Sequence, residues 1–183
     1  MNETAKNRAE MPAGAAKTLD RRTLESANRN VLPLLKTGQT VLDVGCGSGA
    51  ITEGIARKVG TAGKVIGIDT SAQLIAAAKK RCIGLSQLDF VEADIFDYQT
   101  TLRFDLVSSA RVLQWLTEPA AALRKMVSLL KANGEQMVKD GYFEETARQA
   151  AIREYRRWMQ EDAQSMRMYL LAVAGRKNAV PDA

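Results

Sequence analysis

Short apolar runs alternate with amphipathic stretches along most of this chain. Runs rich in β-branched residues predict buried strands, and apolar residues spaced three to five positions apart predict helices. We expect strands at residues 40–44, 64–69, 88–94, 104–109 and 135–138, and helices at residues 17–35, 50–59, 71–81 and 118–130. Because strands and helices alternate, the pattern predicts an α/β fold: a doubly wound, mostly parallel, Rossmann-like sheet with helices on both faces.

The pattern changes near the fifth expected strand. The sequence Ala132-Asn133-Gly134 predicts a turn just before that strand. Residues 144–164 form one long helical pattern, and residues 168–174 predict a final strand that ends at Gly175. A chain of 183 residues has the size of one domain. We therefore expect a single domain over residues 1–183, in which residues 1–12 form a flexible tail.

Composition and charge exclude several protein classes. Hydrophobic residues make up 46% of the chain and charged residues 26%, near the average for globular proteins. No apolar run approaches the about 20 residues that a membrane-spanning helix needs. The net charge of +5 indicates a solvated surface rather than a nucleic-acid-binding one. Two cysteines, Cys46 and Cys82, without a secretory signal pattern predict a reducing, cytoplasmic location.

The chain has no histidine, which removes the commonest general base and metal ligand. Two cysteines are too few for a zinc cluster, so we expect no metal site. The remaining candidate bases are Asp, Glu and Tyr, and no single one stands out. The sequence therefore assigns no catalytic residue.

A strand that runs into a glycine-rich turn carries the strongest signal for function. Residues 41–49 read VLDVGCGSG and lead into the helix expected at residue 50. Glycine allows a sharp turn and the close approach of a ligand to the backbone. The spacing of Gly45, Gly47 and Ala50 also fits the dinucleotide-binding pattern G-x-G-x-x-G/A. The turn alone therefore leaves open which nucleotide-containing cofactor binds.

Three carboxylates follow three successive strands of the expected sheet. Asp43, Asp69 and Asp94 stand at the strand ends, where the crevice of a doubly wound sheet binds its ligand. These acids suit a ligand with an amine, a ribose diol and an adenine amino group. They suit a pyrophosphate poorly, because its negative charge would be repelled.

This arrangement resembles the class I S-adenosylmethionine-dependent methyltransferases, in particular those that act on small molecules. The resemblance rests on the glycine-rich turn and on VIGIDTS at residues 65–71, FVEADIFDY at 90–98, DLVSSARVLQWL at 105–116 and LLKANGEQMV at 129–138. It implies S-adenosyl-L-methionine as the cofactor. It also implies that the methyl group moves to the acceptor by in-line displacement, in which the cofactor carries the reactivity.

The resemblance also implies roles for individual residues. Asp43 and the turn residues Gly45, Cys46, Gly47 and Gly49 would hold the methionine part of the cofactor. Asp69, with Thr70 and Ser71, would bind the ribose. Asp94, with Ile95, would bind the adenine. After the fourth strand, Ser109 and Ala110 would contact the cofactor. Arg111, Gln114 and Trp115 would contact the acceptor.

The class of methyl acceptor is indicated by a motif that this chain lacks. Members of the family that methylate amino groups of nucleic acids carry an Asn/Asp-Pro-Pro-aromatic turn after the fourth strand, whereas this chain has Ser108-Ser109-Ala110-Arg111. That difference disfavours nucleic acid, and the resemblance implies a small-molecule acceptor.

The C-terminal part also departs from the family, whose final strand is antiparallel. Residues 168–175 resemble that strand, so the resemblance implies a final antiparallel strand in this sheet. Residues 139–167, however, hold one helical pattern and no further strand pattern. We expect either a minimal form of the fold or a segment missing near Val138 and Lys139.

Several of these residues also have a purely structural interpretation. Asp69 also suits the N-cap of a helix, Asp94 a surface acid, Trp115 a core aromatic and Arg111 a solvated charge. We expect Cys46 to fill the turn rather than to react. For the whole chain, a nicotinamide-dependent oxidoreductase and a cofactor-binding module without catalysis remain alternatives.

Overall fold

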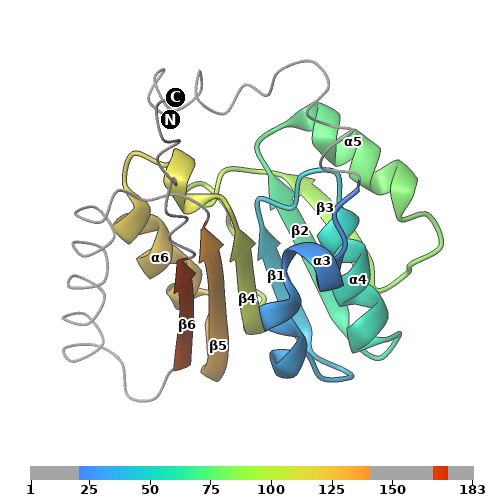
Figure 1. The fold of residues 1–183 in the computed structure, drawn as a ribbon, viewed down its shortest axis with the longest axis horizontal. Helices are drawn as coiled ribbons and strands as arrows, with labels where there is room; N and C mark the ends of the chain where they lie inside the picture. Colours follow the sequence, from blue (N-terminus) through green and yellow to red (C-terminus); the bar gives the residue numbers. More distant parts are fainter. Residues whose placement is uncertain (1–20, 141–166, 173–183) are drawn as a thin grey trace, which may run out of the picture.

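A single parallel sheet organises the chain. The computed structural model describes residues 21–140 and 167–172, and Figure 1 shows the strands side by side with helices in front of and behind them. The sheet has six strands in the order β3-β2-β1-β4-β5-β6, and every neighbouring pair is parallel. The strands are β1 (Thr40–Val44), β2 (Lys64–Asp69), β3 (Leu88–Glu92), β4 (Phe104–Ala110), β5 (Leu130–Asp140) and β6 (Arg167–Ala172).

Helices cover both faces of this sheet, which confirms the doubly wound α/β prediction. They are α3 (Leu24–Ala27), η1 (Arg29–Leu34), α4 (Ala50–Val59), α5 (Ala72–Arg81), η2 (Leu113–Trp115) and α6 (Pro119–Ser128). One core contains Val41 and Val65 together with residues of α3, η1 and α4. The other contains Leu42 and Ile66 together with residues of η2 and α6. Adjacent residues of one strand thus face opposite layers.

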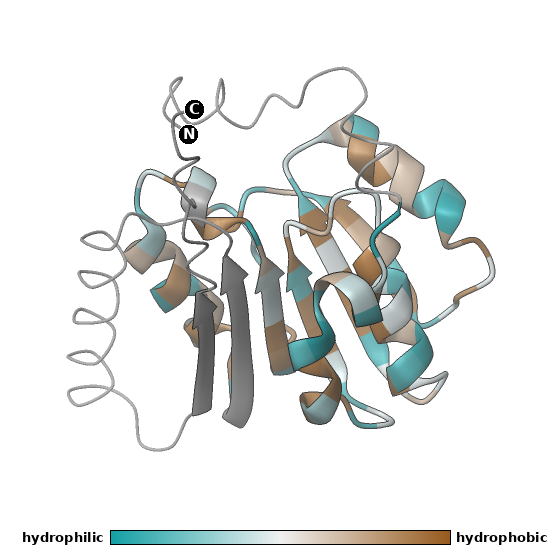
Figure 2. Cartoon of the chain, viewed as in Figure 1, coloured by the Kyte–Doolittle hydropathy of each residue, from teal (hydrophilic) through white to brown (hydrophobic). Residues whose placement is uncertain are grey.

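Hydrophobic residues lie in the sheet, and hydrophilic residues lie at exposed helix ends. Figure 2 shows hydrophobic colour along β1 and β2 and hydrophilic colour at the C-terminal end of α5. That end carries Lys79, Lys80 and Arg81, where cations interact favourably with the helix dipole. Within residues 21–140 and 167–172, no helix combines the length and apolarity needed to cross a membrane.

Local signals predicted the central elements well. The bounds of β1, β2 and α4 agree with the expected ranges, because each has a clear boundary residue. Gly49 in the left-handed conformation begins α4, and Gly60 ends it. Ser71 caps α5 by accepting a hydrogen bond from the Leu74 N–H at 3.3 Å.

The long helix expected at residues 17–35 is wrong over the described residues. The chain forms the short α3 and then η1, separated by Asn28, whose backbone (φ −143°, ψ 36°) is not helical. Pro33 lies within η1, and proline has no N–H for a regular helical hydrogen bond. The apolar spacing was correct for burial within the described residues, since Leu24, Ala27 and Val31 are all buried.

The turn expected at residues 132–134 lies inside β5. Phe104 pairs with Leu130, yet Leu106 pairs with Glu135, so the register shifts between them. The extra residues of β5 are accommodated as an irregularity of the strand. The Asn-Gly signal therefore marks a break in pairing rather than the end of an element.

The final strand is parallel, so the expected antiparallel orientation is wrong. β6 pairs with β5 in the parallel register from Glu135 with Arg167 to Asp140 with Ala172. A parallel pair needs a crossover of a dozen residues or more, and residues 141–166 provide that length.

Several predictions lie outside the described residues. These are the helix at residues 144–164, the end of the final strand at Gly175 and the flexible tail at residues 1–12. The two alternatives for residues 139–167 and the single domain over residues 1–183 stay predictions.

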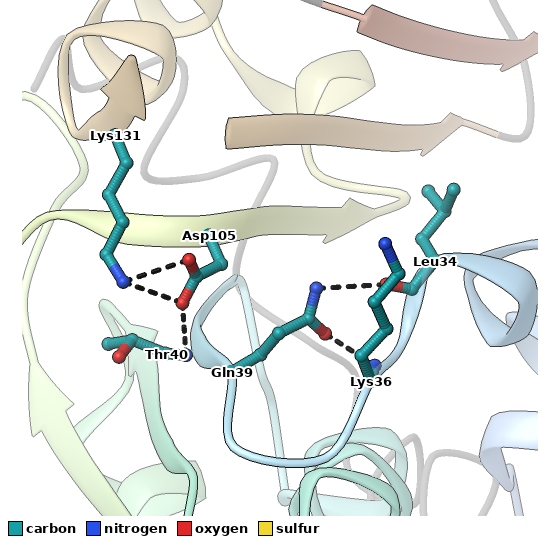
Figure 3. A network of polar contacts seen from close by, with 6 residues as sticks. All are labelled: Leu34, Lys36, Gln39, Thr40, Asp105 and Lys131. Atoms are coloured by element: carbon teal, nitrogen blue, oxygen red, sulfur yellow. Dashed lines mark hydrogen bonds and ion pairs between the residues drawn. The ribbon is translucent and has the colours of Figure 1, made fainter. Parts of the chain in front are cut away.

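A polar network ties the strands together at their amino ends (Figure 3). Asp105 of β4 accepts hydrogen bonds from the Thr40 backbone N–H at 2.7 Å and from Lys131 Nζ at 2.9 Å to each carboxylate oxygen. Nearby, Gln39 bridges Leu34 and Lys36 at the end of η1. This network thus lies at the edge of the sheet opposite to the predicted binding residues, which follow the carboxyl ends of the strands.

Candidate functional site

The turn after β1 is the centre of the carboxyl edge. Gly45, Gly47 and Gly49 have φ of 72°, 55° and 77°, a region that side chains rarely adopt. The N–H groups of Gly45 and Cys46 both donate to the Ile68 carbonyl, at 2.8 and 3.0 Å. The glycine-rich turn is therefore bound directly to β2, and its conformation requires the glycines.

Asp69 links this turn to the next one. Its Oδ2 accepts from the Gly47 N–H and its Oδ1 from the Ser71 N–H, each at 2.9 Å. The residue is partly exposed, and burial raises the pKa of its carboxyl while these N–H donors oppose the rise. Since Ser71 supplies the N-cap of α5, the interpretation of Asp69 as that cap is wrong. Each Asp69 oxygen keeps a lone pair for a further donor. Thr70 beside it is exposed.

Asp43 lies deeper than the sequence suggests. It is 3% exposed, and its Oδ2 accepts from the Thr52 hydroxyl at 2.7 Å. Burial raises its pKa to about 6, against the lowering effect of hydrogen bonds from Thr52 and Ser108. Ser108 Oγ in turn accepts from Asn28 Nδ2 at 3.3 Å. Asp43 thus joins β1 to α4 beneath the turn.

Asp94 and Ile95 follow β3. Asp94 is partly exposed, and its Oδ1 accepts from the Phe96 N–H at 3.0 Å. Among the described residues, no side-chain or backbone donor bonds to its other oxygen, which can therefore accept from an amino group. Ile95 is 4% exposed and belongs to the core, so little of its surface remains for a ligand.

The end of β4 brings a second set of predicted residues to the same edge. Ser109 is fully buried and Ser48 in the turn is 3% exposed. Neither hydroxyl has a hydrogen-bond partner in the part of the chain that the structure describes. Ala110 and Arg111 are partly exposed. Buried hydroxyls without partners are costly, and their position beside the turn fits a polar ligand.

The two predicted residues in η2 are placed differently. Trp115 is 45% exposed, so the core-aromatic interpretation is wrong. It remains free to contact an acceptor. The side chain of Gln114 lies outside the described residues.

Packing explains part of the glycine pattern. A Cβ on Gly49 would lie 2.8 Å from Phe90 Cζ, and one on Gly67 would lie 2.7 Å from Phe90 Cδ1. Cys46 belongs to the same apolar cluster, and burial strongly raises the pKa of its thiol. These contacts support Cys46 as a residue that fills the turn, since a reactive thiol needs a lowered pKa.

Sequence reasoning missed four residues that shape this site. Thr52, Ser108, Asn28 and Phe90 act through contacts between distant segments. The serines after Leu106 were visible as polar residues in a buried strand, which was the available signal. Among the described residues, no group of three His, Cys, Asp or Glu side chains could hold a metal ion.

The residues at this edge fit S-adenosylmethionine. Asp69 and Asp94 offer acceptor oxygens for ribose hydroxyls and for an adenine amino group, while the orphan Ser48 and Ser109 hydroxyls offer further polar partners. The partly exposed carboxylates of Asp69 and Asp94 would repel a pyrophosphate bound beside them. The donor set therefore favours a cofactor without phosphates.

Comparisons with known proteins point the same way. A family model described as a methyltransferase domain matches residues 35–176. The chain is 33% identical over 109 residues to a 2-phytyl-1,4-naphtoquinone methyltransferase of Trichormus variabilis, covering 57% of this chain and 48% of that protein. It is 34% identical over 119 residues to a trans-aconitate 2-methyltransferase of Rhizobium etli, covering 65% and 45%. The chain thus spans about half the length of the curated relatives it matches.

A solved structure shares the architecture. A SAM dependent methyltransferase from Aquifex aeolicus superposes with a TM-score of 0.57 at 28% identity, over 66% of this chain and 68% of that one.

Proposed function

The chain belongs to the class I S-adenosylmethionine-dependent methyltransferase family, and from this premise we propose that it transfers a methyl group from S-adenosyl-L-methionine to a small organic acceptor. The observation that carries the proposal is the Asp69 carboxylate, which is oriented by the Gly47 and Ser71 N–H groups at the carboxyl edge of the sheet. A carboxylate held in this way is prepared to accept two hydroxyl donors.

The cofactor-binding roles rest on the same edge. We assign the ribose to Asp69 with Thr70 and Ser71, and the adenine to Asp94, with the core residue Ile95 supporting that position from below. We assign the methionine end to the glycine-rich turn, with Ser109 and Ala110 beside it. Asp43 contributes from below, because its bond to Thr52 holds α4 under the turn. When bound, the cofactor supplies an electrophilic methyl group on a sulfonium.

The protein's own contribution is position and electrostatics. Holding acceptor and donor in line lowers the barrier by roughly 7–11 kcal/mol in well-oriented systems. We assign no general base, since the chain has no histidine and an acceptor that is already nucleophilic needs none. Arg111, Gln114 and Trp115 are the proposed acceptor side, and exposed Trp115 offers an apolar surface there.

The acceptor class is supported by the relatives and by the sequence after β4. The names of the two relatives refer to a naphthoquinone and to trans-aconitate, both small molecules. Ser108-Ser109-Ala110-Arg111 lacks the proline pair of enzymes that methylate nucleic-acid amino groups. The free, buried Cys46 and Cys82 support a cytoplasmic location.

Calorimetry separates this proposal from its alternatives. We expect S-adenosylhomocysteine to bind the full chain and NAD not to bind. Tight NAD binding without a response to S-adenosylhomocysteine would favour the oxidoreductase alternative and overturn the proposal.

Methyl transfer itself needs a second assay. Labelled S-adenosylmethionine is incubated with trans-aconitate as the first acceptor, and then with a metabolite extract fractionated by polarity. Transfer of label to an organic product supports the enzyme. Binding of S-adenosylhomocysteine without transfer to any fraction would leave the non-catalytic module as the function.

A further inference from the structure

A fully buried asparagine lies at the break between α3 and η1, beside α4 and the sheet (Figure 1). Asn28 Nδ2 donates a hydrogen bond to Ser108 Oγ of β4 at 3.3 Å, although the two residues lie 80 positions apart. Asn28 Oδ1 is also buried and has no hydrogen-bond partner among the described residues. Because an amide with an unpaired oxygen is costly to bury, stability alone does not account for this residue.

Ser108 lies next to Asp43 in the sheet. The two are register partners on β4 and β1, so their side chains point to the same face. Leu106 and Val41, two positions earlier on the same strands, pack in the core with α3, η1 and α4. Since side chains alternate along a strand, Ser108 and Asp43 face that same helical layer. They therefore form the polar end of this layer, toward the glycine-rich turn.

The hydrogen bonds between these side chains have one direction. Ser108 Oγ accepts from Asn28 Nδ2, so the Ser108 hydroxyl keeps its proton for the neighbouring Asp43 carboxyl. A hydroxyl donor stabilises the ionised form of a carboxyl, and the hydrogen bond from Ser108 lowers the pKa of Asp43 against the rise that burial causes. Without the amide of Asn28, this hydroxyl is free to rotate away from Asp43.

Further groups face Asp43 from α4, from β2 and from the turn. Thr52 of α4 donates to Asp43 Oδ2 at 2.7 Å. Asp69 at the end of β2 raises the pKa of Asp43 by its negative charge. The Cys46 thiol in the turn also interacts electrostatically with Asp43 and stays neutral, because burial strongly raises its pKa. Of the two hydroxyl donors, Ser108 is the one that a further side chain holds in place.

We propose that Asn28 is a positioning residue, which fixes the Ser108 hydroxyl so that it donates to Asp43 and holds this carboxylate ionised beneath the glycine-rich turn. The break between α3 and η1 serves this contact, because it brings the Asn28 amide to β4. The consequence for cofactor binding rests on the proposed function: an ionised Asp43 attracts the positively charged S-adenosylmethionine, and a protonated one does not.

The first arm of the test measures the ionisation of Asp43 without any ligand. The Asp43 carboxyl is titrated by carbon-13 NMR in the full chain, and its signal is identified by its loss in Asp43→Asn. We expect a midpoint near 6 in the unchanged chain. Asn28→Leu and the smaller Asn28→Ala both remove the amide donor and should raise the midpoint by about one pH unit.

A double variant tests whether Asn28 acts through Ser108. Ser108→Ala removes the hydroxyl itself and should raise the midpoint at least as much as Asn28→Leu. Asn28→Leu combined with Ser108→Ala should raise it no further, because the amide then has no hydroxyl to hold. Thr52→Val removes the separate bond from α4, so its effect should add to that of Asn28→Leu.

Ser26→Ala is the control for disturbance of α3. Ser26 is exposed and takes part in the capping box of α3, but it does not contact the buried polar side chains. We expect Ser26→Ala to leave the Asp43 midpoint unchanged.

The second arm measures S-adenosylmethionine affinity by calorimetry from pH 5 to pH 8. Affinity of the unchanged chain should fall as pH drops through about 6, where Asp43 is protonated. In Asn28→Leu and Asn28→Ala this fall should occur about one pH unit higher, while affinity at pH 8 recovers to within about twofold. A merely structural defect would instead weaken binding at every pH.

Three results would overturn the role of Asn28: an unchanged Asp43 midpoint in its variants, an equal shift in Ser26→Ala, or additive shifts in the double variant with Ser108→Ala. If the midpoints shift as expected but the unchanged chain does not bind S-adenosylmethionine, the proposed function is refuted and the positioning of Asp43 by Asn28 stands.

Discussion

The Asp69 carboxylate accepts a hydrogen bond from the Gly47 backbone N–H at 2.9 Å, which joins the end of β2 to the turn after β1. The bond connects residues 22 positions apart. It makes the position of the proposed ribose-binding acid depend on the conformation of the glycine-rich turn. A change at either residue is therefore expected to alter ligand binding.

Replacing Asp69 by asparagine tests this relationship. Asp69→Asn keeps one acceptor oxygen but loses the charge and the second N–H partner. We expect the affinity for S-adenosylhomocysteine to fall by about 10- to 100-fold, because hydrogen bonds to charged groups contribute roughly 1.5–3 kcal/mol. Calorimetry measures the loss, and Asp97→Asn at an exposed aspartate is the control. Unchanged affinity in Asp69→Asn would remove Asp69 from the site.

The burial of the Asp43 carboxyl predicts that the free energy of unfolding depends on pH. Its pKa of about 6 in the folded protein lies above the ordinary value of 3.8, so folding favours the protonated form. The contribution of protonated Asp43 to the free energy of unfolding is fully present below pH 3.8. As pH rises through about 6, the free energy of unfolding falls by roughly 1–3 kcal/mol. Urea unfolding at pH 4, 5, 6 and 7 measures the slope. Asp43→Asn is expected to flatten it, whereas Asp97→Asn keeps it; equal slopes in all three proteins would contradict the prediction.

Gly67 predicts a packing conflict with Phe90. A methyl group at residue 67 would lie 2.7 Å from Phe90 Cδ1, too close for van der Waals contact. We expect Gly67→Ala to lower the free energy of unfolding by about 1–3 kcal/mol, as overpacked cores do. Phe90→Leu makes room for the methyl group, so the double variant should recover part of the loss. Purely additive effects of the two changes would refute the proposed contact.

Asp105 provides a contrast, because it lies at the amino edge of the sheet. Lys131→Met removes an exposed ion pair and should cost no more than about 1 kcal/mol of stability. Asp105→Ala also removes the acceptor of the Thr40 N–H and should cost more, about 1–3 kcal/mol. Denaturant unfolding measures both, and neither change should alter S-adenosylhomocysteine affinity. Weakened binding in Lys131→Met would show that the two edges are coupled.

Local signals were sufficient for the centre of the fold. β1, β2 and α4 are bounded by glycines or by a capping serine within the same segment, so their ends could be read directly. The carboxylates Asp69 and Asp94 were located for the same reason, because each follows a short apolar strand. These features depend on neighbours in the sequence.

Features that depend on distant residues were not predictable. The burial of Asp43 requires Thr52 and Ser108 from two other elements, and the need for glycine at residue 67 arises from Phe90 on the adjacent strand. The register shift in β5 and the parallel direction of β6 depend on pairing with neighbouring strands.

By itself, the sequence determined the order of the elements, the glycine-rich turn and the acids that follow the strands, since hydrophobic periodicity and turn chemistry act over a few residues. The tertiary structure alone decided how deeply each acid is buried, which buried hydroxyls lack partners among the described residues, and which way the last strand runs. Burial, desolvation and strand pairing arise between segments that meet only on folding, and they set the charge and hydrogen-bonding capacity of the site.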